Sequence, residues 1–405
     1  MSTAPAHALA AAGVTAPRGF RAGAVASGIK PDRLDLALLA ADAPCTAAAV
    51  FTTNRAQAAP VTVSREHLAS GRARAVVVNA GCANAATGDA GLADARETAA
   101  LVARALGCAP GEVVVASTGV IGVPLPMEKL RAGVPAAAAA LSREGGPDAA
   151  RAIMTTDTRE KRTLVEIELD GVPVRIGGMA KGAGMIAPRM ATMLAFFTTD
   201  ATIDAPLLQD ALRHAVGASL NRITVDGDTS TNDMAVVLAS GAAGATPITG
   251  PGAAFDAFRD ALTQAARALA EMIVRDGEGA TRFAEVRVEG ARSEEDADLV
   301  ARAIAESPLV KTALHGGDPN WGRILAAAGR SGVGLDASRV DIHLGDVWVC
   351  AGGAARAYDE AVAHAAVTAD PVLIRVDLNA GEAVGWMWTC DISRAYVDIN
   401  AHYRS

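Results

Sequence analysis

The sequence predicts a mixed α/β protein in which helices pack on largely buried β-sheets. Short runs of Val, Ile and Leu, typical of buried strands, alternate with longer segments that carry apolar residues at helical spacing. Aromatic residues make up only 3% of the 405 residues, so the cores must be built mainly from Ala, Val, Leu and Ile. At about 100–200 residues per domain, this length predicts two or three domains.

The charge and the cysteines exclude several classes of protein. A net charge of −8 provides no basic field for phosphate backbones, and the few aromatics offer no platform for stacked bases, so no nucleic-acid partner is expected. Five widely spaced cysteines without a CxxC pair are typical of reduced thiols in a cytoplasmic protein. Because there is no HExxH pair and no GxSxG elbow, we expect neither a metal nor a hydrolase triad.

Neither a targeting segment nor a membrane span is expected. Arg18, Arg21 and Lys30 give the N-terminal segment the charge of a transit peptide, but no apolar stretch or cleavage pattern follows. The charge-free run 235–255 is long enough to cross a membrane, yet its second half contains several glycines and prolines. We interpret it as a strand followed by a loop.

The first half of the chain is expected to alternate strands and helices. Strands are expected at 34–39, 47–51, 75–78, 113–116, 164–169 and 172–176. The last two are joined by Asp170-Gly171, a strong hairpin signal. Helices are expected at 94–106, ending at the C-cap Gly107, and from about Pro126.

The second half continues the alternation after a β-like stretch at 194–199. Helices are expected at 205–216, 253–274, 294–305 and 359–367. Strands are expected at 282–288, 340–344 and 372–378, and 315–323 is expected to be a loop.

The polar run 221–233 has features of a calcium-binding loop. Thr231 stands at the sixth position, where glycine is needed, and Val237 stands at the twelfth, where Glu is needed. We therefore expect a tightly hydrogen-bonded structural loop near a functional site.

The stretch 181–197 combines a glycine-rich run with one hydroxyl that precedes a β-like segment. Residues 182–187 formally fit the dinucleotide fingerprint GxGxxA. However, Pro188 blocks the helix that should follow, and the segment after Thr192 is β-like, so the Rossmann interpretation fails. Thr192 is then either an ordinary threonine at a strand start or a nucleophile.

A threonine hydroxyl is a weak nucleophile and needs a base close by. One solution is an N-terminal threonine whose own α-amine accepts the proton, which requires cleavage of the chain before it. The preceding Ala191 is small, and Gly182 and Gly184 allow the strained backbone that an N-to-O acyl shift needs.

Three further polar features stand at expected element ends. Thr118 followed by Gly119 can aim a hydroxyl and an N–H at one oxygen, as an oxyanion hole requires, or can form an ordinary capped turn. The tract 155–158 either binds a substrate or caps a helix. Glu278 between two glycines is either a site carboxylate or a solvated turn residue. The residues alone leave these alternatives open.

The run 181–188, followed by 190–194, resembles the self-cleavage motif of the ornithine acetyltransferase family, the glutamate N-acetyltransferases of arginine biosynthesis. The other blocks that look like this family follow in order along nearly the whole chain: 28–37, 51–54, 79–84, 117–122, 154–158, 226–233, 276–281 and 318–323. Nine blocks in the right order make the resemblance specific.

The resemblance implies a two-part fold and autocleavage between Ala191 and Thr192. The products would be an α chain, 1–191, which carries the oxyanion loop, and a β chain, 192–405, which includes the C-terminal domain. The two chains would stay associated, as an α2β2 heterotetramer.

The resemblance also implies the chemistry. Thr192 would take the acetyl group of N2-acetylornithine and pass it to glutamate in a ping-pong cycle, while the Thr118 hydroxyl and Gly119 N–H hold the oxyanion. Glu278 would move a proton or accept from a substrate amine, and Lys181 would pair with an α-carboxylate. The implied substrate contacts are Thr155, Lys181, Thr192, Glu278, Asn400 and Ser405.

No cofactor is implied, and acetyl-CoA stays open as a co-substrate. The alternative from another chemical class is a self-processing N-terminal-threonine amidohydrolase or aminopeptidase, in which water takes the acyl group. A small-molecule binding module would instead keep an intact chain and form no acyl intermediate.

Overall fold

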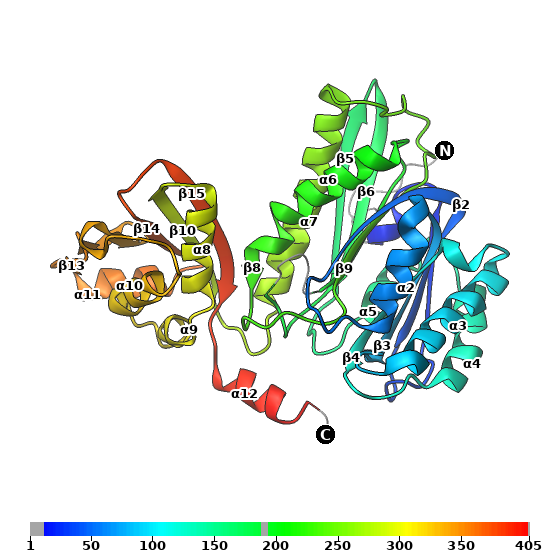
Figure 1. Ribbon diagram of the computed structural model, residues 1–405, viewed down its shortest axis with the longest axis horizontal. Coiled ribbons are helices and arrows are strands. Elements are labelled where there is room, and N and C mark those ends of the chain that lie inside the picture. Colours follow the sequence, from blue (N-terminus) through cyan, green and yellow to red (C-terminus); the bar gives the residue numbers. More distant parts are fainter. Residues whose placement is uncertain (1–11, 188–192, 404–405) are drawn as a thin grey trace. The chain divides into compact units, whose positions relative to one another are not determined.

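The computed structural model describes residues 12–187 and 193–403 (Figure 1). They form two compact units. Unit 1 contains the described residues of Met1–Gly182, Ala187–Asn221 and Thr229–Ile273. Unit 2 contains those of Ala183–Ile186, Arg222–Asp228 and Val274–Ser405. The predicted mixed α/β class is confirmed. The division into α and β chains at 191–192 follows a different boundary from these units and stays a prediction.

Unit 1 is built on a mixed sheet of eight strands among the described residues, in the order β4-β3-β2-β9-β7-β6-β5, with β1 paired to β2. The strands are β1 (Phe20–Val25), β2 (Leu36–Phe51), β3 (Arg72–Cys82), β4 (Val113–Val120), β5 (Lys161–Leu169), β6 (Val172–Lys181), β7 (Leu194–Thr199) and β9 (Met234–Ala239). The helices are α2 (Ala59–His67), α3 (Gly88–Leu106), α4 (Met127–Ala139), α5 (Gly146–Ala152), α6 (Ala205–Gly217) and α7 (Ala253–Arg275).

Alternation along the strands explains why this sheet is covered on both faces. Val76 and Val78 of β3 pack in a core with Ile153 near α5. Val77, between them, packs in a second core with Val102 of α3. Because successive side chains of a strand point to opposite faces, an unbroken run of apolar residues here marks a strand buried on both sides.

Unit 2 is built on a second sheet, in the order β13-β12-β11-β14-β10-β15-β8. Its strands are β8 (Ile223–Thr224), β10 (Phe283–Ala291), β11 (Asp341–Leu344), β12 (Val347–Ala351), β13 (Ala354–Ala355), β14 (Val372–Asp377) and β15 (Ala383–Cys390). Its helices are α8 (Glu294–Ala305), α9 (Pro308–Gly316), α10 (Trp321–Gly329), α11 (Glu360–Val367) and α12 (Arg394–Ala401) (Figure 1). One core of Val, Ile, Leu and Ala side chains joins this sheet to α8.

Several predicted elements are confirmed. The hairpin of β5 and β6 turns at Asp170 and Gly171, both with positive φ, as a two-residue turn requires. Helix α3 ends at Gly107 in the left-handed conformation, although it begins six residues before the predicted start at 94. Helix α8 spans the predicted residues, with Ser293 as its N-cap.

Other predictions were wrong in extent. The two strand runs at 34–39 and 47–51 form one strand, β2, whose pairing with β3 shifts register between Ala40 and Cys45. Strand β4 continues through Val120, so Thr118 and Gly119 lie in a strand and not in the turn beyond it. The loop expected at 315–323 is shorter, because α9 runs through Gly316 and α10 begins at Trp321, with Asn320 as N-cap. The elements that were not predicted are strands β1, β8, β12, β13 and β15 and helices α2, α5, α9, α10 and α12.

No helix in the described parts of the chain combines the length and the apolar character that a membrane crossing requires.

Candidate active site

The predicted site residues are divided between the two units. Thr118, Gly119, Thr155 and Lys181 belong to unit 1, and Glu278 and Asn400 belong to unit 2. Ala191, Thr192 and Ser405 lie outside the described residues.

Thr118 and Gly119 occupy the end of β4, where it runs parallel to β3. Gly119 has φ of +134°, and a Cβ at this position would lie 2.3 Å from the carbonyl carbon of Gly81. Only glycine fits, since the neighbouring backbone cannot move away cheaply. Thr118 is thus followed by a half-buried glycine, a residue whose main chain can approach a ligand closely and present an N–H to it.

A buried amide network fixes the main chain just before Thr118. The Ser117 hydroxyl donates to Asn79 Oδ1 over 2.6 Å, and Asn232 Nδ2 donates to the Ser117 carbonyl over 2.8 Å and to the Ala83 carbonyl over 2.6 Å. All three polar side chains are buried. A fully bonded buried network of this kind makes the local backbone rigid.

Lys181 ends β6, and its Nζ lies 3.3 Å from Thr118 Oγ1, to which it donates. The structure therefore brings two predicted site residues together, although 63 positions separate them in the sequence. Lys181 is buried, 8% exposed, so its charge requires compensation nearby.

Asp157 supplies that compensation. Its Oδ1 accepts from Lys161 Nζ and from the Gly182 N–H, both over 2.7 Å, and its Oδ2 accepts from the Thr155 N–H over 3.0 Å. Burial alone would raise the pKa of Asp157, but the charges of Lys181 and Lys161 and these hydrogen bonds outweigh it. They hold the pKa well below the usual range, so Asp157 is ionised.

Asp233 is a second buried carboxyl near Lys181, with the opposite character. Burial raises its pKa well above the ordinary value, and hydrogen bonds from Ser230 and the charge of Lys181 only partly offset this. Within the described residues its Oδ2 has no hydrogen-bond partner. Asp233 stands directly before Met234, whose N–H donates to the carbonyl of Met193 over 3.1 Å.

Lys30, also in unit 1, extends the basic character of this region. Its Nζ donates to the Met154 carbonyl over 2.8 Å. Burial, and then the charge of Arg33, lower its pKa to about 8, although Asp35 and Asp157 act in the opposite direction.

In unit 2, the segment Ala183–Ile186 is held by its main chain. Asp226 accepts from the Met185 N–H over 2.5 Å and from the Ile186 N–H over 2.8 Å. The Ile186 carbonyl accepts from the Val225 N–H over 2.7 Å and from Thr224 Oγ1 over 3.0 Å. Met185 takes a positive φ of 55°, uncommon for a residue with a side chain. The segment is a fixed, strained turn.

Glu278 lies against this turn. Its N–H donates to the Ala183 carbonyl over 2.8 Å, and a Cβ added to Gly184 would lie 2.4 Å from the carboxylate. Asn400 Nδ2 donates to Glu278 Oε2 over 2.7 Å. Glu278 is only 6% exposed, so the interpretation as a solvated turn residue is wrong. The structure joins Glu278 and Asn400 by this hydrogen bond, and their roles as substrate contacts stay a prediction.

Three aspartates of the site were not among the predicted site residues. Asp157, Asp226 and Asp233 fall within blocks noted for their polarity, 155–158 and 221–233. Asp157 and Asp226 accept from main-chain N–H groups that are distant in sequence, at Gly182 and Ile186, whereas Asp233 binds the nearby Ser230. The polar composition indicated that these segments lie near a site, but it could not identify the hydrogen-bond partners of the three aspartates. Within the described ranges, no three His, Cys, Asp or Glu side chains gather as metal ligands.

Comparison with known proteins agrees with the resemblance seen in the sequence. The ArgJ family model matches residues 21–405. Among curated relatives, "Arginine biosynthesis bifunctional protein ArgJ" from Symbiobacterium thermophilum is 53% identical, with 98% of this chain and 99% of that protein aligned. The protein of the same name from Dehalococcoides mccartyi is 50% identical, with 96% of each aligned.

Among solved structures, the crystal structure of arginine biosynthesis bifunctional protein ArgJ from Bacillus halodurans is 46% identical, with a TM-score of 0.50. The match covers 52% of this chain and 99% of that one. With the family model and the two curated relatives each matching nearly its whole length, this chain belongs to the ArgJ family, which confirms the resemblance to ornithine acetyltransferases.

Proposed function

We propose that this chain cleaves itself before Thr192 and then transfers an acetyl group from N2-acetylornithine to glutamate through an acetyl-Thr192 ester. As a member of the ArgJ family, the chain is an ornithine acetyltransferase of arginine biosynthesis. The covalent route, the roles of single residues and the α2β2 assembly are part of the proposal.

The observation that carries the proposal is the fixation of the chain on both sides of residues 188–192. Before them, the Ala187 carbonyl accepts from Thr229 Oγ1 over 3.1 Å. After them, the Met193 carbonyl accepts from the Met234 N–H over 3.1 Å. Intramolecular attack on a peptide bond is favoured when the reacting groups are held close to the attack geometry.

Self-cleavage would proceed in two steps. Thr192 Oγ1 attacks the carbonyl carbon of Ala191, the C–N bond breaks, and an ester joins the two residues. Water then hydrolyses the ester, which leaves a carboxylate on Ala191 and a free α-amine on Thr192. The amine can afterwards accept the proton of the hydroxyl.

Acetyl transfer uses the same hydroxyl. Thr192 Oγ1 attacks the acetyl carbonyl of N2-acetylornithine, and the α-amine takes the proton and gives it to the leaving ornithine amine. The Thr118 hydroxyl and the Gly119 N–H stabilise the oxyanion, as preorganised donors do. The glutamate amine then attacks the ester, and N-acetylglutamate leaves.

The remaining predicted residues bind and orient the two amino acids. Lys181 pairs with the substrate α-carboxylate, an interaction strengthened by its burial. Thr155, Asn400 and Ser405 contribute hydrogen bonds. Glu278 accepts a hydrogen bond from a substrate amine or transfers a proton, and Asn400 holds its carboxylate in place.

Two comparisons support parts of the proposal. The Bacillus halodurans chain is matched over 99% of its own length by 52% of this chain, and a processed β chain, 192–405, would have about that share. The relatives are named bifunctional, which supports acetyl-CoA as a second acetyl donor.

The decisive experiment combines a gel with mass spectrometry. Wild-type protein should run as two fragments under denaturing conditions, and Thr192→Ala should run as one. After incubation with N2-acetylornithine and acid quenching, the β chain should carry one acetyl group on its first residue. An intact wild-type chain or an unmodified β chain would contradict the proposal, and acetate release without glutamate would instead indicate an amidohydrolase. A parallel assay with acetyl-CoA and glutamate tests the second donor.

A further inference from the structure

We propose that Asp157 is a positioning residue for both reactions, because one buried carboxylate sets the geometry of Lys181 and of the chain that leads to the cleavage position. This inference rests on the proposed function. It concerns a residue outside the predicted catalytic and substrate-contact sets.

The Gly182 N–H lies just beyond the end of a strand and is bound by Asp157. Lys181 is the last residue of β6 and pairs with Leu194 of β7, so the strand ladder ends there. The next main-chain donor, the Gly182 N–H, is taken by Asp157 Oδ1 over 2.7 Å. Asp157 therefore fixes the peptide plane between Lys181 and Gly182, and with it the direction in which the chain leaves the sheet.

The same carboxylate also holds the main chain of a predicted substrate contact, Thr155. Asp157 Oδ2 accepts from the Thr155 N–H over 3.0 Å, so the tract 155–157 is folded around the carboxylate. Thr155 and Lys181 lie far apart in sequence, and Asp157 is hydrogen-bonded to the main chain at both places. One side chain thus sets the spacing between two predicted substrate-binding groups.

These contacts require a carboxylate at position 157. Two donors meet at Oδ1 and one at Oδ2, and all are N–H groups. An asparagine could present its oxygen to only one side, and its NH₂ group would then face another donor. The negative charge also lies close enough to Lys181 for the two charges to interact.

The paired Lys161 explains how the carboxylate is kept in place. The two side chains are 1% and 0% exposed, and Nζ lies 2.7 Å from Oδ1. A buried pair of this kind is often no more stable than a well-packed apolar pair, whereas removal of one partner leaves an uncompensated charge. The pair can therefore be removed as a unit to separate folding from positioning.

The test compares wild type with Asp157→Asn/Lys161→Met, which removes both charges. The expected result is a folded protein, less stable than wild type because Lys181 loses its negative partner, but with a melting temperature that stays above the assay temperature. It should cleave itself at least about tenfold more slowly and show a KM for N2-acetylornithine raised at least about tenfold, each equivalent to the loss of about 1.4 kcal/mol of positioning. If the pair served only for stability, the cleavage rate and the KM would both match wild type. That result would overturn the inference.

Asp157→Glu keeps the test decisive if the double variant does not fold. It retains the charge beside Lys161 but displaces the oxygens by one methylene, so the Gly182 and Thr155 contacts cannot both be kept. Slower cleavage and a raised KM are expected again, and wild-type behaviour would again overturn the inference.

The matched control is the double variant Asp210→Asn/Arg213→Met, which removes an exposed ion pair of α6 in the same unit. It should match wild type in every measurement. If wild type neither cleaves nor transfers acetyl, the proposed function fails and this inference falls with it. If wild type does both and the Asp157 variants match it, only this inference fails.

Discussion

Among the described residues, each unit contains one fully buried lysine, and the two lysines are stabilised in different ways. Lys161 in unit 1 forms an ion pair with Asp157. Lys311 of α9, in unit 2, donates over 2.6 Å to Thr389 Oγ1 and also to the carbonyl of Cys390. One lysine thus has a charged partner, whereas the other has neutral acceptors.

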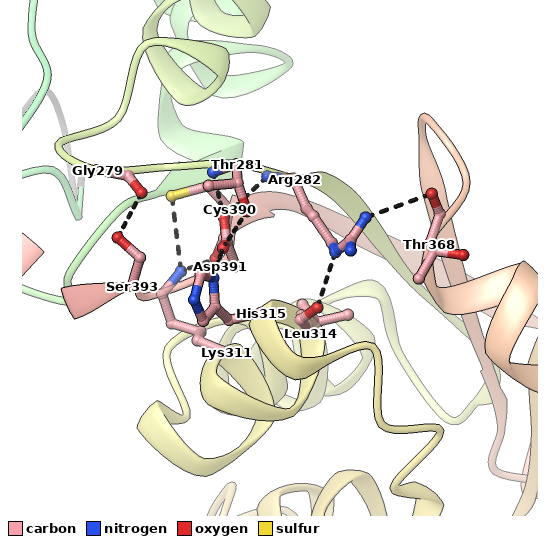
Figure 2. A network of polar contacts seen from close by, with 10 residues as sticks. All are labelled: Gly279, Thr281, Arg282, Lys311, Leu314, His315, Thr368, Cys390, Asp391 and Ser393. Atoms are coloured by element: carbon pink, nitrogen blue, oxygen red, sulfur yellow. Dashed lines mark hydrogen bonds and ion pairs between the residues drawn. The ribbon is translucent and has the colours of Figure 1, made fainter. Parts of the chain in front are cut away.

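The carboxylate of Asp391, which follows Cys390 in the sequence, is engaged elsewhere. Figure 2 shows Asp391 directed to Thr281, Arg282 and His315, while Lys311 is directed to Cys390. Burial consequently lowers the pKa of Lys311, and the nearby negative groups only partly offset this. Unit 1 thus has a buried ion pair where a charged substrate is proposed to bind. Unit 2 uses a lysine mainly as a hydrogen-bond donor between α9 and β15.

The largest effect is expected for Lys161→Met. The substitution leaves the carboxylate of Asp157 buried beside an apolar side chain, which costs about 3–5 kcal/mol in comparable pairs. Urea denaturation should report this loss in the free energy of unfolding. A loss below about 1 kcal/mol would show that Lys181 and the N–H donors suffice to stabilise Asp157.

Lys311→Met should cost less, about 1–3 kcal/mol. It removes donors from two neutral oxygens, and Thr389 Oγ1 keeps its hydrogen bond to the Ala305 carbonyl. The same denaturation experiment measures it. If this variant proved less stable than Lys161→Met, the distinction between the two lysines would be wrong.

The pH dependence of stability should separate the lysines further. Because the folded-state pKa of Lys311 lies below 10.5, the unfolded chain binds more protons between the two values, and stability rises with pH through that window. The slope approaches about 1.4 kcal/mol per pH unit. Asp157 acts at the acid end, where its depressed pKa makes stability fall as the pH drops below 3.8. Between pH 7 and 10, Lys311→Met should lose the part of this rise that Lys311 contributes and keep the part that comes from Lys30, whereas Asp157→Asn/Lys161→Met should keep the Lys311 part.

The smallest effect is expected for Arg213→Met. Its partner Asp210 and Arg213 itself are more than 60% exposed, so solvent screens the pair and less than about 1 kcal/mol is lost. A loss comparable to that of Lys161→Met would mean that burial is not what distinguishes the pairs.

The sequence predicted elements with strong periodicity or clear turn residues. The hairpin at Asp170-Gly171, helix α8 and strand β7 were all identified, because each carries a local signal. Helices α9 and α10 were missed, since each spans only nine residues and they lie in a glycine-rich stretch that favoured a loop. Strand β15 contains Gly385 and two tryptophans, a mixed pattern that its pairing with β10 decides.

The site was predictable only in part. The family motifs identified Lys181, Thr118, Glu278 and Asn400, and the structure joins them in pairs within each unit. Motifs could not reveal that Asp157 binds the Gly182 N–H, because that contact depends on how β5 and β6 fold back. Nor could they reveal that the pKa values of Asp157 and Asp233 shift in opposite directions, since burial raises both and only at Asp157 do nearby lysines and hydrogen bonds outweigh it.

The strand order of unit 1 has a consequence for the processed enzyme. In the run β2-β9-β7-β6, the two middle strands follow residue 192 and the two outer strands precede it. The ladders that join them, β2 with β9 and β6 with β7, contain six residue pairs each. A cut at 191–192 would therefore leave two polypeptides interleaved within one sheet. They could separate only if the β2–β9 and β6–β7 ladders both broke. After separation, no covalent link would hold the two polypeptides in register. The sheet of unit 1 would therefore form in the uncleaved precursor, and the two cleaved polypeptides would not form it again after separation.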